Sequence, residues 1–170
     1  MVRSGPVSRS EIEERVEALG FELVDFEWVG SKQRPILRLR VDTADSTPGD
    51  GVTVGDCARV SRALEAWLDE LEEVPGRYVI EVSSPGVERP LTRVRDWSRF
   101  SGHRVAVEGA QPLVGDQRRV EGELLGPVEE EGDSEAERCS VRVRIRMDGG
   151  DDLILPLSEI KRAHLVHEWT

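Results

Sequence analysis

The hydrophobic positions near the start of the chain recur at helical spacing and then change to strand spacing. Ile12, Val16 and Leu19 lie three or four residues apart, which predicts a short amphipathic helix from Ser10 to Leu19. Ser8 and Glu11 have the spacing of a capping box just ahead of it. We therefore expect this helix to pack one face against the rest of the domain.

Two strand-like runs follow, Phe21 to Val29 and Ile36 to Asp42. Apolar residues and arginines alternate in the second run, as in a strand with one buried face. The residues from Gly30 to Pro35 have the composition of a turn. The two strands are therefore predicted to form a hairpin.

A second helix is predicted to begin after Thr53, where Asp56 occupies the reciprocal capping position. One apolar stripe follows its length and consists of Cys57, Val60, Leu64, Trp67 and Leu71. The helix should end before Pro75, and Tyr78 to Val82 alternates like a third strand. The order helix, strand, strand, helix, strand predicts a small α+β domain with both helices on one face of a three-stranded sheet.

Beyond Gly102 no helical stripe returns, and short alternating runs are separated by turn residues. The predicted strands are Arg104 to Val107, Arg119 to Leu125, Cys139 to Met147, Leu153 to Leu157 and Ala163 to Val166. Five short strands fit a small closed barrel of the SH3-like or Sm-like kind, because closure removes exposed sheet edges. The predicted fold is thus an α+β domain over residues 8–92, a short helical linker over 93–102 and an all-β barrel over 103–170, with each half folding separately.

The composition restricts the location and the cysteine chemistry that we expect of the protein. The chain has 170 residues with 38% hydrophobic content, and no apolar run approaches the roughly 20 residues that cross a bilayer. The segment from Met1 to Pro6 lacks the apolar stretch of a secretory signal, so we expect a cytoplasmic protein with no membrane partner. Cys57 and Cys139 are too few for a disulfide framework and are interpreted as small buried hydrophobic residues.

The formal net charge of −11 argues against a protein that coats nucleic acid by electrostatics alone. Any contact with RNA must then be local, and an acidic surface suits a basic protein partner. Solubility explains the same charge equally well.

A search for catalytic groups gives no positive case. Ser83 and Ser84 lack the glycine spacing of a nucleophile elbow. The histidines are not accompanied by cysteines or carboxylates at metal-ligand spacing, and no phosphate-binding glycine loop occurs. We therefore predict no catalytic residue, no metal and no cofactor.

The segment from Ser83 to Leu91 leaves a predicted strand and has two interpretations. It is either a rigid interdomain turn shaped by its prolines and glycine, or a recognition loop, because residues 88–104 carry five arginines against two carboxylates. Residue types alone leave both open. The candidate binding residues are Ser83, Ser84, Pro85, Gly86, Arg89, Pro90, Arg93, Arg95 and Arg99. Of these, Arg89 is also a candidate hinge residue that pairs with a carboxylate.

This segment resembles the RimP family, whose most characteristic stretch is Glu-Val-Ser-Ser-Pro-Gly followed by Arg-Pro-Leu. The matching residues are Glu81, Val82, Ser83, Ser84, Pro85, Gly86, Arg89, Pro90 and Leu91. The predicted second helix is also similar to that of the family, through Asp56, Cys57, Val60, Ser61, Arg62, Leu68 and Asp69. Further similarity occurs at Gly20 to Val24 and at Phe100, Gly102, Val105 and Val107, so the resemblance covers about residues 10–125.

The resemblance implies the two-domain fold described above and a non-enzymatic function. It implies a factor that binds the free small (30S) ribosomal subunit late in assembly and contacts ribosomal RNA and small-subunit protein twelve. We expect a monomer that acts in this way. The alternatives are a general RNA-binding chaperone, which the net charge and few aromatic residues disfavour, and a hydrolase acting through Ser83 or Ser84.

The acidic stretch from Glu129 to Glu137 departs from the family pattern and is predicted to be a mobile loop. Its carboxylates, with Glu129, Glu130 and Glu131 as the candidates, suit a contact with a basic ribosomal protein. A solubilising insertion is the alternative. The barrel half, residues 103–170, is accordingly expected to contact a basic protein rather than bare RNA.

Overall fold

The structure is a computed structural model that describes residues 5–47, 50–128 and 141–167. The chain divides into two compact units, and the division falls between Gly86 and Val87. Both helices and sheets are present, one sheet mixed and the other antiparallel, which confirms the predicted α+β class. No helix within the described ranges is long and apolar enough to cross a membrane.

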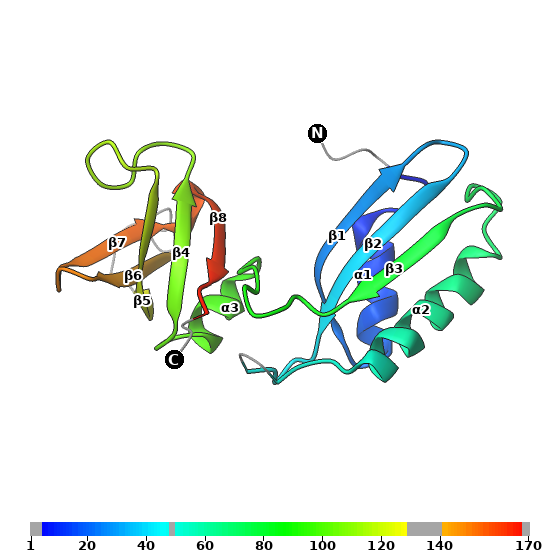
Figure 1. The fold of residues 1–170 in the computed structure, drawn as a ribbon, viewed down its shortest axis with the longest axis horizontal. Helices are drawn as coiled ribbons and strands as arrows, with labels where there is room; N and C mark the ends of the chain where they lie inside the picture. The colour runs from blue at the N-terminus through cyan, green and yellow to red at the C-terminus, as the bar shows by residue number, and fades with distance from the viewer. Residues whose placement is uncertain (1–4, 48–49, 129–140, 168–170) are drawn as a thin grey trace, which may run out of the picture. The chain divides into compact units, whose positions relative to one another are not determined.

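The first unit has the element order helix, strand, strand, helix, strand (Figure 1). Its elements are α1 (Arg9–Ala18), β1 (Glu22–Gly30), β2 (Pro35–Asp42), α2 (Val54–Leu68) and β3 (Val79–Ser83). β1 and β2 form an antiparallel hairpin, whereas β3 lies parallel to β2, giving the sheet order β1-β2-β3. The parallel pairing is possible because α2 provides the crossover from one end of the sheet to the other.

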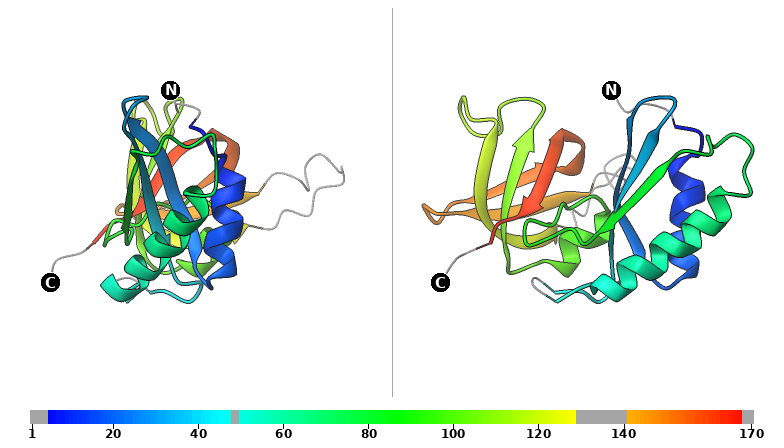
Figure 2. Two further views of the ribbon diagram at one scale, coloured as in Figure 1. Left: turned by 90° about the vertical axis from the view of Figure 1, so that its right-hand side faces the viewer. Right: turned by 45° about the vertical axis from the view of Figure 1, so that its right-hand side comes forward.

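Both helices of this unit cover the same face of the sheet, as the turned views show (Figure 2). Leu37 and Leu39 of β2 are fully buried beneath them, together with Ile12 of α1 and Val60 and Leu64 of α2. The predicted capping boxes are present at the starts of both helices. Alternation in β2 places its arginines on the opposite face of the sheet, which the helices leave open.

The positions of Tyr78 and Cys57 differ in detail from those that the sequence predicts. The hydroxyl of Tyr78, just before β3, donates to Oδ1 of Asp69 at 2.6 Å, and burial followed by this hydrogen bond raises the pKa of Tyr78. Cys57 is half-buried against the core, rather than fully buried. Burial and then the charge of Asp56 raise the pKa of its thiol. Cys139 lies outside the described residues.

The second unit is an antiparallel five-stranded sheet preceded by a short helix (Figure 1). Its elements are α3 (Val94–Arg99), β4 (Arg104–Gly109), β5 (Arg119–Val128), β6 (Arg142–Met147), β7 (Asp152–Pro156), the 3-10 helix η1 (Leu157–Glu159) and β8 (Ile160–Leu165). The strand order is β7-β6-β5-β4-β8. Alternate residues of these strands, such as Val105, Leu124 and Ile145, form one core.

The helix that the sequence analysis placed in a linker over residues 93–102 belongs to this second core. Trp97 and Phe100 are 3% and 1% exposed and pack with Leu124 and Val105. Leu91, which comes before the helix, is buried in the same core. The helix α3 therefore packs into this core: it is too short to show an apolar stripe, yet two large aromatic residues on one side suffice to anchor it.

Candidate functional site

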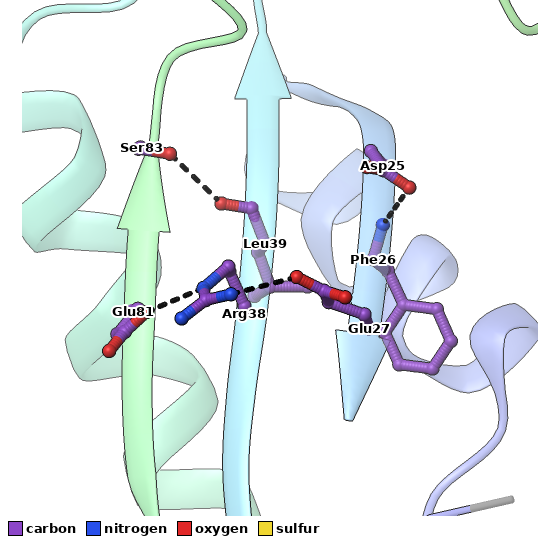
Figure 3. A network of polar contacts seen from close by, with 7 residues as sticks. All are labelled: Asp25, Phe26, Glu27, Arg38, Leu39, Glu81 and Ser83. Atoms are coloured by element: carbon purple, nitrogen blue, oxygen red, sulfur yellow. Dashed lines mark hydrogen bonds and ion pairs between the residues drawn. The ribbon is translucent and has the colours of Figure 1, made fainter. Parts of the chain in front are cut away.

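The candidate segment begins where β3 ends, at Ser83. The Ser83 hydroxyl donates to the main-chain oxygen of Leu39 on β2 at 3.5 Å (Figure 3). This contact joins two strands and supplies no general base for the hydroxyl. Ser84 is exposed. The geometry therefore gives no support to a hydrolase that acts through these serines.

A charge network lies beside Ser83 on the open face of the sheet (Figure 3). Arg38 on β2 donates to Glu81 on β3 at 2.7 Å and to Glu27 on β1 at 2.9 Å. These hydrogen bonds, with Glu81 contributing most, raise the pKa of Arg38. All three side chains are more than 40% exposed, so the network joins the strands but adds little to the free energy of unfolding.

The chain then turns at Gly86, which has a φ of 78°. This left-handed conformation is strained for residues with a side chain and ordinary for glycine. Pro85 just before it is half-buried. These observations agree with the interpretation of Ser83 to Gly86 as a shaped turn.

Arg89 is buried, and the expectation that it lies on an exposed binding surface is wrong. It is 5% exposed and its Nη1 lies 3.2 Å from Oδ1 of Asp96, which is itself fully buried. Its guanidinium also lies over the ring of Phe100, 4.8 Å from the ring centre. The alternative interpretation, a hinge residue that pairs with a carboxylate, is confirmed for the pairing alone, because the main chain of Arg89 is hydrogen-bonded to β8.

Asp96 organises the start of α3 as well. Its Oδ2 accepts hydrogen bonds from the main-chain N–H groups of Thr92 and Arg93, each at 3.0 Å. These amides begin a helix and have no partner within it. Asp96 occupies the third position of α3, where a carboxylate commonly caps a helix. This position of Asp96 is visible in the sequence, but counting the charges of residues 88–104 does not reveal it.

The residues from Arg89 to Leu91 form part of the sheet. The N–H of Leu91 donates to the oxygen of Ala163, and the N–H of Leu165 donates to the oxygen of Arg89, both at 2.9 Å. Pro90 lies between them opposite His164 and has no N–H to leave unpaired at this edge. The segment therefore covers the outer edge of β8, and its Arg-Pro-Leu sequence has a structural role.

The other three candidate arginines remain at the surface of α3. Arg95 is exposed, whereas Arg93 and Arg99 are half-buried. The guanidinium of Arg99 lies 5.0 Å from the ring centre of Phe100, which supports its side chain from below. We call Arg93, Arg95 and Arg99 the α3 arginine surface.

The two units carry equal numbers of aspartates and glutamates, 17 each, but these lie differently along the chain. The described part of the first unit carries nine lysines and arginines against 17 aspartates and glutamates. The described part of the second unit carries 12 against 10. The carboxylates between residues 129 and 137, Glu129, Glu130 and Glu131 among them, lie outside the described residues.

The fold and the site define an α+β protein with a basic helical surface. In the described ranges, no group of three or more metal-binding side chains comes together. Residues 11–88 match the family model described as the RimP N-terminal domain. The match covers a little less than half of the chain and supports the assignment of this domain to the RimP family. The match confirms the resemblance seen in the sequence, and it includes Ser83 to Gly86 but ends before the α3 arginine surface.

Proposed function

We propose that this protein binds the free small ribosomal subunit and assists its late assembly in the cytoplasm without covalent chemistry. The observation that carries the proposal is the match of residues 11–88 to the RimP N-terminal domain. The α3 arginine surface supports it, because arginines that are exposed or half-buried at the surface suit contacts with RNA phosphates. The five-stranded unit is proposed to be an SH3-like or Sm-like barrel.

The proposal includes a contact with a basic ribosomal protein, small-subunit protein twelve by family resemblance. The first unit provides the excess of carboxylates that would attract such a partner. Glu129, Glu130 and Glu131 remain candidates for the same contact.

Sedimentation of cell extract through a sucrose gradient tests the proposal. The protein should migrate with free small subunits and be absent from joined ribosomes. Migration only at the top of the gradient at both low and moderate salt would contradict small-subunit binding. Equal association with all RNA-containing fractions would instead indicate a general RNA-binding chaperone.

Charge reversal tests the α3 arginine surface. Purified protein with Arg93→Glu and Arg95→Glu should bind isolated small subunits at least about tenfold more weakly, with a salt dependence reduced by about two in log–log slope. The matched control is Lys32→Glu with Arg34→Glu, which changes the charge equally at exposed positions of the β1–β2 turn. Equal binding by the two double variants would overturn the assignment of this surface.

A further inference from the structure

Strand β3 forms one edge of the three-stranded sheet in the first unit. It pairs with β2 on one side, and among the described residues no main-chain hydrogen bond reaches its other side. An uncovered edge presents N–H and C=O groups that can pair with a strand of another chain. In the second unit, by contrast, the edge at β8 is covered by Arg89 to Leu91 of the protein itself. The main chain of β3 is therefore free to pair with a partner.

The side chains of β3 that face the helices are only partly covered. Leu37 and Leu39 of β2 are fully buried, whereas Ile80 and Val82 of β3 are half-buried against the same core. The register places Ile80 beside Leu37 and Val82 beside Leu39, on the same face of the sheet. Their burial differs because β3 has a neighbouring strand on one side alone. A strand added at this edge would bury more apolar surface of Ile80 and Val82.

The open face of the sheet carries a row of alternating charge that ends at the same edge (Figure 3). Glu27, Arg38 and Glu81 lie opposite one another on the three strands, and Arg38 pairs with both carboxylates. Among the described residues, Glu81 has no partner other than Arg38. The next position in this row, on an added strand, would adjoin Glu81. Because opposite charges on neighbouring strands stabilise a sheet, the row favours a lysine or arginine at that position.

A second row of the open face is apolar. Val29, Ile36 and Val79 lie opposite one another on the three strands, and all three are half-buried. Val79 and Glu81 are two residues apart and so point to the same face. An added strand would therefore suit an apolar residue beside Val79, two positions from its basic residue.

We propose that the outer edge of β3 binds an extended segment of a basic protein, which adds a fourth strand to this sheet. The segment has a lysine or arginine beside Glu81 and apolar residues beside Val79, Ile80 and Val82. Main-chain hydrogen bonds provide the affinity of such strand addition, and alternating side chains provide its specificity. A protein is favoured over RNA, because carboxylates outnumber basic residues among the described residues of this unit and repel phosphate. The inference rests on the proposed function and names the surface that its basic protein partner uses.

Charge reversal of Glu81 tests this edge with a matched control. In the full chain, Glu81→Lys should weaken binding to isolated small subunits about tenfold, because it places like charges side by side in the new strand pair. Glu27→Lys breaks the other ion pair of Arg38 and changes the net charge equally, and it should alter binding by less than about twofold. Equal binding by the two variants would overturn the inference and leave the proposed function standing. If the unchanged protein does not bind small subunits, the proposed function fails and the inference fails with it.

Hydrogen exchange tests the main-chain contact without any substitution. In the complex of the unchanged protein with isolated small subunits, the outward amides of Val79 to Ser83 should exchange about tenfold more slowly than in the free protein. Unchanged exchange at β3 in the complex would overturn strand addition.

Photochemical crosslinking identifies the class of partner. A photoreactive amino acid at the exposed position of Arg77, just before β3, should form adducts with protein in the bound subunit. The same group at the exposed position of Glu14 on α1 should form fewer. Adducts with RNA alone at position 77 would overturn the choice of a protein partner.

Discussion

At the scale of single residues, Arg89 and Asp96 show how neighbouring arginines come to have different roles. Arg89 is enclosed with its carboxylate partner and the ring of Phe100, whereas Arg95, six residues later, is exposed. The two residues have the same side chain and the same charge. Their roles differ because Arg89 lies on the segment that pairs with β8.

The buried pair of Arg89 and Asp96 should contribute measurably to the free energy of unfolding. Arg89→Met leaves Asp96 buried without the guanidinium, and breaking a buried ion pair in this way should lower the free energy of unfolding by roughly 3 kcal/mol. Urea denaturation of the full chain followed by tryptophan fluorescence measures the change, because Trp97 lies in the same core. The control Arg95→Met should change stability by less than about 0.5 kcal/mol. Equal stability of the two variants would contradict a structural role for Arg89.

The sequence could predict the arginine cluster but not which member is buried. Five arginines between residues 88 and 104 are visible in the sequence, and so is the carboxylate at Asp96. Their pairing depends on β8, which lies about 70 residues further along the chain. A contact over that distance leaves no periodic pattern in either segment.

At the scale of elements, α2 shows which signals in a sequence are reliable. The N–H of Thr53 donates to Asp56 at 2.9 Å, the hydroxyl of Thr53 does so at 2.8 Å, and the N–H of Asp56 donates to the Thr53 hydroxyl. The helix then buries Val60, Leu64 and Leu68 at helical spacing. Capping and periodicity both arise within a few residues, and so both could be predicted. The helix α3 has only six residues and offers one capping position and no full stripe.

The cap of α2 can be tested through stability and its dependence on pH. Thr53→Ala should lower the free energy of unfolding by about 1 kcal/mol at neutral pH. The N–H and hydroxyl of Thr53 lower the pKa of Asp56, so the removal of the hydroxyl should raise this pKa part of the way to its ordinary value. Because the folded pKa is lowered, the contribution is present above the unfolded pKa and is lost as the pH falls through the folded pKa.

The measurements for this prediction are urea denaturation between neutral and strongly acidic pH and a titration of the Asp56 carboxyl by NMR. The difference between the natural protein and the variant should shrink as Asp56 becomes protonated. The exposed Thr47→Ala variant serves as a control for loss of a threonine hydroxyl. A stability difference that is constant over the whole pH range would contradict the role of the carboxylate.

At the scale of the whole molecule, the division between Gly86 and Val87 predicts which fragments of the chain fold on their own. Fragments 1–86 and 87–170 should each give dispersed NMR spectra and cooperative unfolding. Fragment 102–170 should not, because it lacks Leu91, Trp97 and Phe100 from its core and leaves the edge of β8 uncovered. Equal folding of the two carboxy-terminal fragments would show that α3 is dispensable.

The number of units and their class could be predicted because the change from helical to strand periodicity is plain in the sequence. The position of the division could not, because the residues from Arg89 to Phe100 are assigned to the second unit by contacts with distant strands.

The pairing of Arg89 with β8 also fixes the length of the tether between the units. Ser83 ends β3 and Arg89 is already bonded to β8, so only Ser84 to Glu88 are available to connect them. Fully extended, this connection spans roughly 20 Å. When one unit engages a large particle, the other is held at an effective concentration in the millimolar range. If each unit contacts the same particle weakly, the two contacts would act together as one stronger attachment through avidity.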